Sequence, residues 1–553
     1  MAFGSQPVKH QLSGSRPDAA VLVWGLVLAA SLLCLGVLAI ATLAWMGGGL
    51  GHLPERSVVI LKSAGIQAGL STVFSGLFAL PAAVTLNRHR MIPFTRFLRL
   101  VLALAMVTPT TVAATGLLEI WGRSGVIAEM CSLLAGPTAC DGFSIYGLHG
   151  VVLAHMFFNI PLMIWIMLPL LEAIPQGQWR VARHLGFDGW TRFRFLEFSA
   201  MRQGFAGGLV LVFLLCFTSF ALVLMLGGGP RVTTLEVEIY AAIRFSFDFK
   251  AAASLSLMQF GIAALVVLMM AFLNRGRQPT VAGETRLPLP PLPQGVLLRC
   301  WDVTVFLMLV FLILLPVVMV VLAGVSGDFA KAVSQRDFNA VTLTSLSVAV
   351  MSALLTLLLA LVLASGRARA ATRLAPARLP LMLLDAGVML YLVIPSIVLG
   401  TAAFILLRQY GDAFRFAFAV VVLANTLLAL PLATRLLEPR LLQTFRRHDR
   451  LAQSLGLGGW WRLRLLTLPV LNREIGQVLG LAAALSVGDL GVIALFASND
   501  FRTLPWLVYQ MAGSYRADMA ASLALVLLII TMLLLLTGRL AGTLFTARSR
   551  SHA

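Results

Sequence analysis

Long runs of apolar residues alternate with short polar stretches along almost the whole chain. Each run has about 20 residues or more, the length that an α-helix needs to cross the hydrocarbon core of a membrane. The pattern predicts an all-α polytopic membrane protein. We expect about twelve transmembrane helices, at 21–45, 57–86, 97–121, 147–171, 204–226, 251–273, 300–323, 341–365, 380–408, 415–437, 476–497 and 519–541.

The composition excludes a soluble protein. Hydrophobic residues make up 59% of the chain and charged residues 12%, and the mean hydropathy is +0.92. Soluble domains carry about 25% charged residues. The net charge is +19, and most Lys and Arg outside the apolar runs lie in alternate loops. The positive-inside rule then predicts cytoplasmic N- and C-termini. Nucleic-acid binding is disfavoured, because the basic residues are divided among short loops.

The chain contains two tandem copies of one sequence unit. The Val-Val-Leu-Ala run at Val151 recurs 270 residues later at Val421, and the Gly-Trp pair at Gly189 recurs at the same offset at Gly459. Each copy has an even number of predicted spans, so the two are parallel repeats. The predicted division is a first transmembrane repeat, a Pro-rich cytoplasmic linker and a second transmembrane repeat, at 1–273, 274–298 and 299–553.

Two of the five cysteines, Cys131 and Cys140, share one predicted outer loop. In an oxidising compartment they could form a disulfide. Two free thiols are the alternative.

The two copies match closely in one cytoplasmic loop each, 172–203 and 438–475. Each loop contains Ala-x-x-Leu-Gly before a Trp and two Arg. The matched residues are Ala182, Leu185 and Gly186 in the first copy, and Ala452, Leu455 and Gly456 in the second. A glycine here suits a left-handed helix cap, so each loop should form a helix, a sharp turn and a second helix. Such loops are either interfacial helices lying on lipid or docking elements for a soluble partner.

Signals for enzymatic chemistry are missing from the sequence. The four lysines are Lys9, Lys62, Lys250 and Lys331, and none belongs to a Gly-x4-Gly-Lys-[Ser/Thr] phosphate-binding loop. Polar residues in the apolar runs are too sparse to form a catalytic constellation. No Cys or His spacing suits a metal. We therefore expect no catalytic residue, no metal site and no cofactor on this chain.

A few polar residues lie within the predicted spans. Asp489 lies in span 476–497, and Ser219 occupies the equivalent position of the first copy. A carboxylate in hydrocarbon is costly and usually faces a pathway or a partner. Fixing helix packing is the alternative for Asp489. For His155 and Asn159 helix-packing hydrogen bonds are the stronger expectation, with a pathway role as the alternative.

Matched prolines interrupt two equivalent spans. Pro109 lies in span 97–121 and Pro395 in span 380–408. A proline break exposes carbonyl groups, which a membrane tolerates only where they line a protein cavity. We therefore expect Pro109 and Pro395 to mark the translocation core.

The two cytoplasmic loops resemble the EAA loop of ABC importer permeases, whose pattern is Glu-Ala-Ala-x3-Gly-x9-Ile-x-Leu-Pro. The residues that carry this resemblance are Arg180, Ala182 and Gly186 in the first copy, and Arg450, Ala452, Gly456, Leu468 and Pro469 in the second. The fused two-copy layout is similar to the ferric-iron and thiamine importer branch. Further stretches closely resemble the permeases of thiamine and thiamine pyrophosphate importers, at 215–221, 226–230, 233–236, 485–492, 499–505 and 513–516.

This resemblance implies a bacterial inner-membrane permease that moves thiamine or its phosphates from periplasm to cytoplasm. It also implies a cytoplasmic ABC ATPase dimer, which would hold ATP and Mg, and a periplasmic thiamine-binding protein. For such a cationic substrate Asp489 could be a transient counter-charge, although fixing helix packing is the stronger expectation for this residue. A ferric-iron permease is the alternative within the class. An ion-gradient-driven secondary carrier is the alternative outside it, although such carriers usually need more intramembrane acids or bases than Asp489 alone.

Overall fold

The computed structural model describes residues 16–48, 54–123, 125–136, 144–227, 232–273, 295–327, 329–372, 378–455, 457, 459–514 and 516–550, and every regular element in these ranges is helical. The first half contains α1 (Arg16–Gly47), α2 (Ser57–Arg88), α3 (Pro93–Val107), α4 (Thr110–Trp121), α5 (Val126–Ala135), α6 (Leu148–Glu172), α7 (Gln176–His184), α8 (Gly189–Arg192), the π-helical turn η2 (Phe193–Glu197), α9 (Phe198–Phe217), α10 (Ala221–Leu226), α11 (Leu235–Arg244) and α12 (Phe249–Leu273).

The second half contains α13 (Val296–Leu309), η3 (Val310–Leu314), α14 (Leu315–Ser326), α15 (Phe329–Val333), α16 (Phe338–Thr372), α17 (Arg378–Val393), α18 (Ser396–Arg408), η4 (Ala413–Phe416), α19 (Ala417–Ser454), α20 (Gly459–Arg462), η5 (Leu463–Thr467), α21 (Leu468–Val487), α22 (Gly491–Phe496), α23 (Leu504–Gly513) and α24 (Ala517–Arg550). Most of the predicted linker 274–298 lies outside the described residues. Its end differs from the prediction, because α13 already begins at Val296.

The helices recur at the spacing found in the sequence. In the first half η2, α9 and α10 have the same lengths as η5, α21 and α22 in the second half, and each begins at the equivalent residue. Even the five-residue π-helical turn is repeated. The two halves are therefore copies of one helical unit.

Nine helices in the described residues are long and apolar enough to cross a membrane, and two bent pairs raise the number to eleven. The pairs correspond to the predicted spans 97–121 and 380–408. The predicted span 476–497 corresponds to α21 and α22, which do not belong to these eleven. The all-helical membrane fold is confirmed, whereas the number of twelve stays a prediction.

One proline explains why the cytoplasmic loops of the two copies differ. Pro175 caps the N-terminus of α7 with an extended backbone, and it separates α7 from α6. Phe445 stands at the equivalent position of the second copy, where α19 continues without a break to Ser454. A proline lacks the N–H group that a continuous helix would need and crowds the preceding turn. The separate first helix expected in the second loop is thus the end of α19.

The first helix of the chain packs against the second copy. Gly25 in α1 lies so close to α16 that a Cβ atom there would come within 3.0 Å of the Gly366 Cα. The hydroxyl of Tyr391 in α17 donates a hydrogen bond to the Leu32 carbonyl of α1, at 2.8 Å. Small residues allow this close approach of helix backbones in a membrane.

The first helix of the second copy packs in turn against the first copy. Asp302 in α13 accepts hydrogen bonds from Thr85 Oγ1 at 3.0 Å, from Arg88 at 2.7 Å and from His89 Nε2 at 2.8 Å. Asp302 and Arg88 are both buried. The two copies therefore exchange their first helices. Two contacts join the copies: α1 packs against the second copy, and α13 packs against the first.

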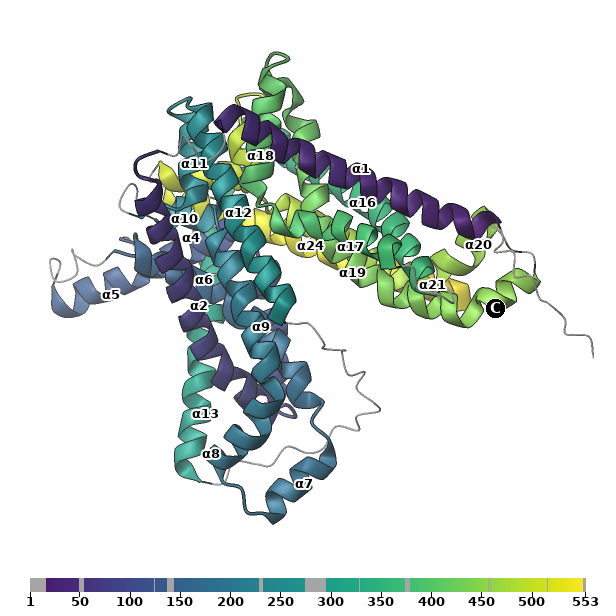
Figure 1. The fold of residues 1–553 in the computed structure, drawn as a ribbon. Helices are drawn as coiled ribbons and strands as arrows, with labels where there is room; N and C mark the ends of the chain where they lie inside the picture. Colours follow the sequence, from purple (N-terminus) through teal and green to yellow (C-terminus); the bar gives the residue numbers. More distant parts are fainter. Residues whose placement is uncertain are drawn as a thin grey trace, which may run out of the picture.

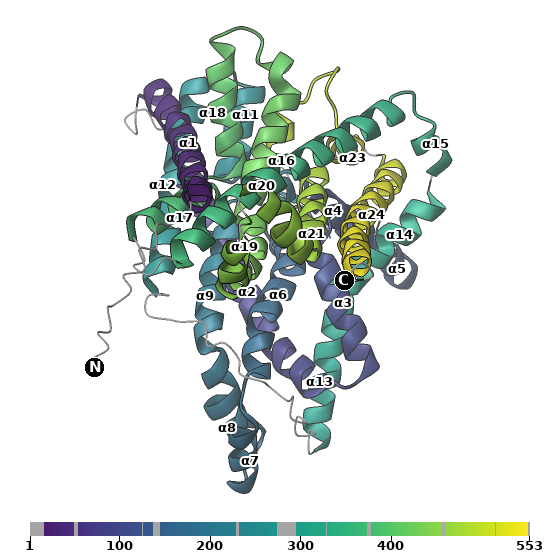
Figure 2. The same cartoon turned by 90° about the vertical axis from the view of Figure 1, so that its right-hand side faces the viewer.

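The helices form two arms that diverge from a common region (Figure 1). We call this region the hub; it contains the helix breaks at Pro109 and Pro395 and the loop that carries Asp489. The first arm contains α2, α6, α9 and α13, and it ends in α7 and α8 at the bottom of the view. The second arm contains α16, α17, α19 and α21 together with α1, and it ends near α20 at the right. Figure 2 shows from another side that the tips of the two arms are well separated. The cytoplasmic loops of the two copies thus occupy two different tips.

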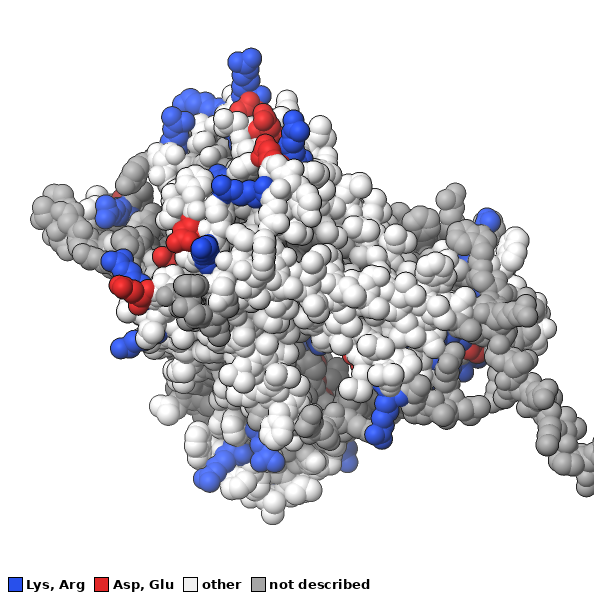
Figure 3. Space-filling model, turned by 45° about the horizontal axis from the view of Figure 1, so that its top comes forward, with Lys and Arg blue, Asp and Glu red and all other residues white. Residues whose placement is uncertain are grey.

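Charged side chains are unevenly distributed over the surface of the molecule. From the side drawn in Figure 3, Lys, Arg, Asp and Glu gather at the top and toward the lower and right-hand ends, with a broad uncharged band between them. Large apolar side chains such as Leu268 in α12 and Leu307 in α13 are exposed in the described helices. This surface suits a lipid environment, because the hydrocarbon core does not solvate charges.

Candidate functional site

Two helices of the hub, one from each copy, are interrupted by a proline. Pro109 precedes α4 and Pro395 precedes α18, each with the fixed φ that proline imposes. The helices on either side of Pro109 are bent by 114°, and those on either side of Pro395 by 93°. The sequence predicted both breaks. Neither bent pair is a straight transmembrane helix.

Both breaks contact the loop between α21 and α22, which carries Asp489. A Cβ atom at Gly488 would lie 3.1 Å from the Pro109 Cβ, so the two residues touch. On the other side, a Cβ atom at Gly491 would lie 2.4 Å from the Ser396 Oγ, directly after Pro395. Three interruptions that are far apart in the sequence therefore meet at one place between the copies.

Asp489 has one satisfied and one unsatisfied carboxylate oxygen. The backbone N–H of Gly491 donates to Asp489 Oδ1 at 3.1 Å. Asp489 Oδ2 is buried and has no hydrogen-bond partner in the described part of the chain. Ser219, the equivalent residue, lies in the matching gap between α9 and α10. The two gaps thus present different chemistry, a carboxylate in one copy and a hydroxyl in the other.

A second acid at the hub, Glu236 in the first turn of α11, was not predicted as a site residue. Its side chain is completely buried, and Gln259 of α12 donates a hydrogen bond to Glu236 Oε1 at 2.8 Å. The predicted topology placed Glu236 in an outer loop, outside the spans. The available signal was the alternation of two carboxylates, Glu236 and Glu238, with the apolar residues Leu235, Val237 and Ile239.

His155 and Asn159 lie between helices of the first arm. Gln67 Nε2 and Ser71 Oγ of α2 lie 2.7 and 3.0 Å from His155 Nδ1. Asn159 Nδ2 donates to the Cys216 sulfur of α9 at 3.1 Å. These contacts join α6 to α2 and α9. Both residues thus make the interhelical hydrogen bonds that were the stronger expectation from the sequence.

The tip of the first arm contains the turn predicted at Gly186. Gly186 has a φ of +65°, and the backbone N–H groups of Gly186 and Phe187 donate to the carbonyls of Arg183 and Ala182 at 3.1 and 3.0 Å. This pair of hydrogen bonds is the Schellman helix ending. Asp188 then caps α8 by accepting from the Thr191 N–H at 2.7 Å. The loop therefore has a defined shape rather than an open coil.

One hydrogen bond of this helix ending recurs at the second tip. The Leu457 N–H donates to the Ala452 carbonyl at 2.9 Å, which is the equivalent of the bond from Phe187 to Ala182. Gly456 lies outside the described residues, as does the side chain of Arg450. Leu468 and Pro469 are partly buried at the start of α21, where Pro469 occupies the first turn.

The two tips present the same pattern of exposed apolar side chains. Arg180 is exposed on α7 beside Val181, whereas Ala182 is buried, as is its equivalent Ala452. The exposed apolar residues occur in equivalent pairs: Val181 and Leu451, Leu185 and Leu455, and Phe195 and Leu465. Matched exposed apolar patches are typical of a protein interaction surface.

Buried ion pairs anchor the second tip to the rest of its arm. Asp449 of α19 bonds to Arg369 at the end of α16 and to Arg462 of α20. The guanidinium carbons of Arg369 and Arg462 lie 4.0 and 5.4 Å from the ring centre of Phe445. At the first tip, Arg192 pairs with Glu197 at 3.5 Å instead. Ion pairs therefore stabilise both tips. The comparison of the two sequence copies did not predict these pairs.

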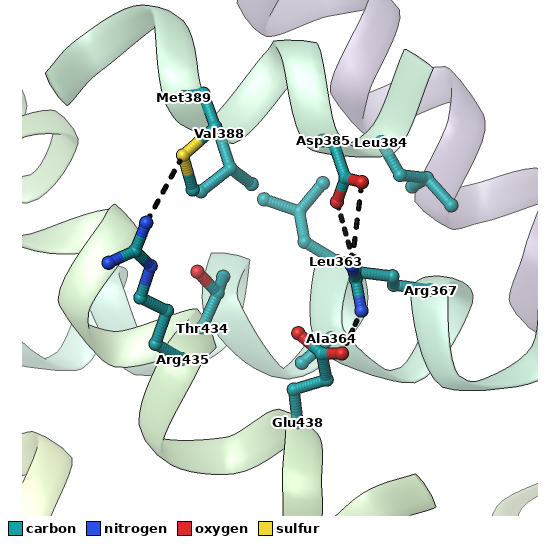
Figure 4. A pocket seen from close by; sticks show the side chains of 10 residues that line it. All are labelled: Leu363, Ala364, Arg367, Leu384, Asp385, Val388, Met389, Thr434, Arg435 and Glu438. Carbon is teal, nitrogen blue, oxygen red and sulfur yellow. Dashed lines mark hydrogen bonds and ion pairs between the residues drawn. The ribbon is translucent and has the colours of Figure 1, made fainter. Parts of the chain in front are cut away.

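A cavity of about 270 Å³ lies behind the second tip, between α16, α17 and α19 (Figure 4). Arg367 projects from α16 across it and bonds to Asp385 of α17 at 2.5 Å and to Glu438 of α19. Because α19 leads into the tip and α17 leads to the Pro395 break, Arg367 links the tip to the hub by a short path. Arg435 lines the other side, 3.7 Å from the Met389 sulfur.

Cys131 in α5 forms a disulfide, whereas Cys34, Cys216 and Cys300 are free. Its predicted partner, Cys140, lies outside the described residues. The pairing of Cys131 with Cys140 therefore stays a prediction.

Two exchanged helical copies, a hub of broken helices and two equivalent tips define a class of protein, an all-helical membrane protein built from an internal repeat. Residues 75–278 match the family of binding-protein-dependent transport system inner membrane components. The chain is thus a multi-pass inner-membrane permease component.

Individual relatives of the chain identify a more specific family within this class. The chain is 39% identical over 473 residues to the thiamine transport system permease protein of Brucella abortus, with 85% of each chain covered. It is 37% identical over 471 residues to the protein of that name from Escherichia coli, covering 85% of this chain and 86% of the relative. The chain belongs to the family of thiamine transport system permease proteins. A putative ferric transport system permease protein of Haemophilus influenzae is 26% identical over 41% of the chain and 35% of its own length.

Proposed function

We propose that the chain is the membrane-spanning subunit of an ATP-driven importer that moves thiamine, its phosphates, or both, from periplasm to cytoplasm. The observation that carries the proposal is the pair of matched tips around one inter-copy hub. Relatives named as thiamine transport permeases, which the chain matches over 85% of its length, supply the substrate.

The tips are the proposed docking sites for a cytoplasmic ATPase dimer. A dimer with two-fold symmetry presents the same surface twice, and it needs two equivalent surfaces on its partner. Val181, Leu185 and Phe195 offer one apolar patch, and Leu451, Leu455 and Leu465 offer the other. ATP and Mg would be held by the ATPase, and this chain would carry no cofactor of its own.

The hub is the proposed gate. When ATP draws the two ATPase subunits together, the arms follow, and the breaks at Pro109 and Pro395 move relative to the loop that carries Asp489. The site then opens to the opposite side of the membrane, where a thiamine-binding protein in the periplasm delivers the substrate. In this orientation both chain termini and both tips are cytoplasmic, as the distribution of Lys and Arg predicts.

The test is transport by the purified chain in liposomes. With the ATPase, the loaded binding protein and ATP, we expect thiamine to accumulate; with a proton or sodium gradient and no ATP, we expect none. Accumulation driven by the gradient alone would overturn the proposal in favour of a secondary carrier. Accumulation of ferric iron but not thiamine by the complete system would overturn the substrate and keep the ATP-driven mechanism.

A further inference from the structure

Glu236 is a buried acid without a counter-charge. Its side chain has no solvent exposure, and its Oε2 atom has no hydrogen-bond partner among the described residues. The donor on its other oxygen, Gln259, is neutral, and the carbonyl oxygen of that amide is also unpaired in the described part of the chain. Burying a carboxylate in this way is costly unless a cation or a proton compensates it.

Helix α11, which carries Glu236 of the first copy, packs against α22, which begins two residues after Asp489 of the second copy. The two carboxylates therefore lie in the same region of the hub. Each acid holds one oxygen in a hydrogen bond and leaves the other unsatisfied. Neither forms an ion pair within the described residues. Two neighbouring carboxylates repel each other, and a cation placed between them would relieve this repulsion. The pair therefore favours the binding of a cation.

Aromatic rings accompany the two acids. Tyr240 follows Glu236 by one turn on the same face of α11, and its ring centre lies 5.4 Å from that of Phe220. From the second copy, Tyr509 lies near Tyr240, and its ring centre is 5.4 Å from that of Trp506. Aromatic faces attract organic cations.

A resident metal ion suits this place poorly. Hard cations such as Ca²⁺ take six to eight oxygen ligands, more than the four oxygens of the two carboxylates. Among the described residues no group of three or more His, Cys, Asp and Glu side chains is arranged for a metal. Two carboxylates with aromatic neighbours fit a flat organic cation better.

We propose that Glu236 and Asp489, one from each copy, form the site that transiently binds the positively charged ring of the transported organic cation. The site rests on the proposed function, for which the thiazolium ring of thiamine is that cation. Because the acids come from opposite copies, movement of the arms would change their separation. The same movement that opens the path would then weaken the site and release the cation.

The test compares neutral variants in the reconstituted complete system. Glu236→Gln and Asp489→Asn keep the shape of each side chain and remove its charge. We expect each to slow ATP-driven thiamine transport by about tenfold or more, the loss of one charged contact. The double variant should be slowed by less than the product of the two effects, because both acids serve one site. Glu238→Gln, on the same helix two residues further on, is the matched control and should transport at the wild-type rate.

A second measurement separates binding from folding. Stimulation of ATP hydrolysis by the loaded binding protein should persist in both variants, and Glu236→Asp should restore part of the transport. Wild-type transport in Glu236→Gln and Asp489→Asn would overturn the inference, and so would equal losses of transport and ATPase stimulation, which indicate a structural role. These outcomes leave the proposed function standing. That function fails separately if the wild-type system moves no thiamine with ATP.

Discussion

Gly186 shows how one residue shapes a docking tip. Its left-handed backbone closes α7, and a Cβ atom there would meet nothing within 4 Å. The need for glycine is therefore conformational rather than steric. A left-handed conformation costs residues other than glycine about 1–2 kcal/mol.

Gly186→Val should distort the tip and weaken ATPase association while leaving membrane insertion intact. Co-purification of the ATPase with the variant measures this. Gly177→Val is the matched control, because Gly177 also faces open space but lies within α7 without a positive φ. Equal ATPase recovery with Gly186→Val and wild type would show that the turn is dispensable.

A substitution at Asp302 would test the contact between the two copies. Asp302→Asn would leave Arg88 buried without its counter-charge, and breaking such a pair costs about 3–5 kcal/mol. We expect a clear fall in the midpoint of thermal unfolding of the purified protein. Asp337→Asn is the control, because Asp337 is 62% exposed and pairs with Arg502 at 3.7 Å. Equal midpoints for the two variants would contradict the fastening role of Asp302.

Sequence reasoning found the residues whose signal is local. Proline interrupts a helix wherever it occurs, so Pro109 and Pro395 could be predicted, and a lone carboxylate in an apolar run pointed to Asp489. Glu236 was missed because its burial depends on α11 folding back into the hub. The pairing of Asp302 with Arg88 was missed because it joins residues of different copies.

At the scale of elements, two pairs of glycines fix the contact between α21 and α24. A Cβ atom at Gly538 would come within 2.5 Å of the Gly476 carbonyl oxygen and 2.7 Å of the Gly480 Cα. A Cβ atom at Gly542 would lie 2.9 Å from the Asn472 carbonyl oxygen of α21. With glycines four residues apart on both helices, the backbones pack directly against each other.

Gly538→Leu should therefore force α21 and α24 apart, at a cost of at least about 2 kcal/mol. We expect a lower yield of monodisperse protein on size-exclusion chromatography. Gly261→Leu in α12 is the control, since nothing lies within 4 Å of a Cβ atom there. Wild-type yield from Gly538→Leu would refute the close packing.

The boundaries of the helices were predicted well where helix-breaking residues such as proline occur, and poorly elsewhere. The matched apolar runs predicted the repeated spans. They did not predict the continuity of α19, because the absence of a proline at Phe445 is a weak signal. The short helices α10 and α22 were missed because their apolar residues merge with the predicted spans that contain them, whereas α11 was missed because it lies in a predicted outer loop.

For the whole molecule, the arrangement of the arms has a mechanical consequence. The tips lie at the ends of two arms, and in the described part of the chain these arms diverge from the hub (Figures 1 and 2). A partner that pulls the tips together must therefore act on the hub. At the second tip Asp449 and Arg367 supply connections along which the force would pass. The sequence could predict two equivalent loops but not their separation, which depends on the exchange of the first helices.

The distance between the tips is the most direct test of this account. Gly177 and Arg447 are equivalent exposed positions on the two tips. Spin labels at Gly177→Cys and Arg447→Cys would report the distance between the tips by pulsed electron paramagnetic resonance in the complete reconstituted system. The free cysteines Cys34, Cys216 and Cys300 would be replaced beforehand. We predict a shorter distance with ATP bound to the ATPase than without nucleotide. The same distance in both states, in a system that still imports thiamine, would contradict the account.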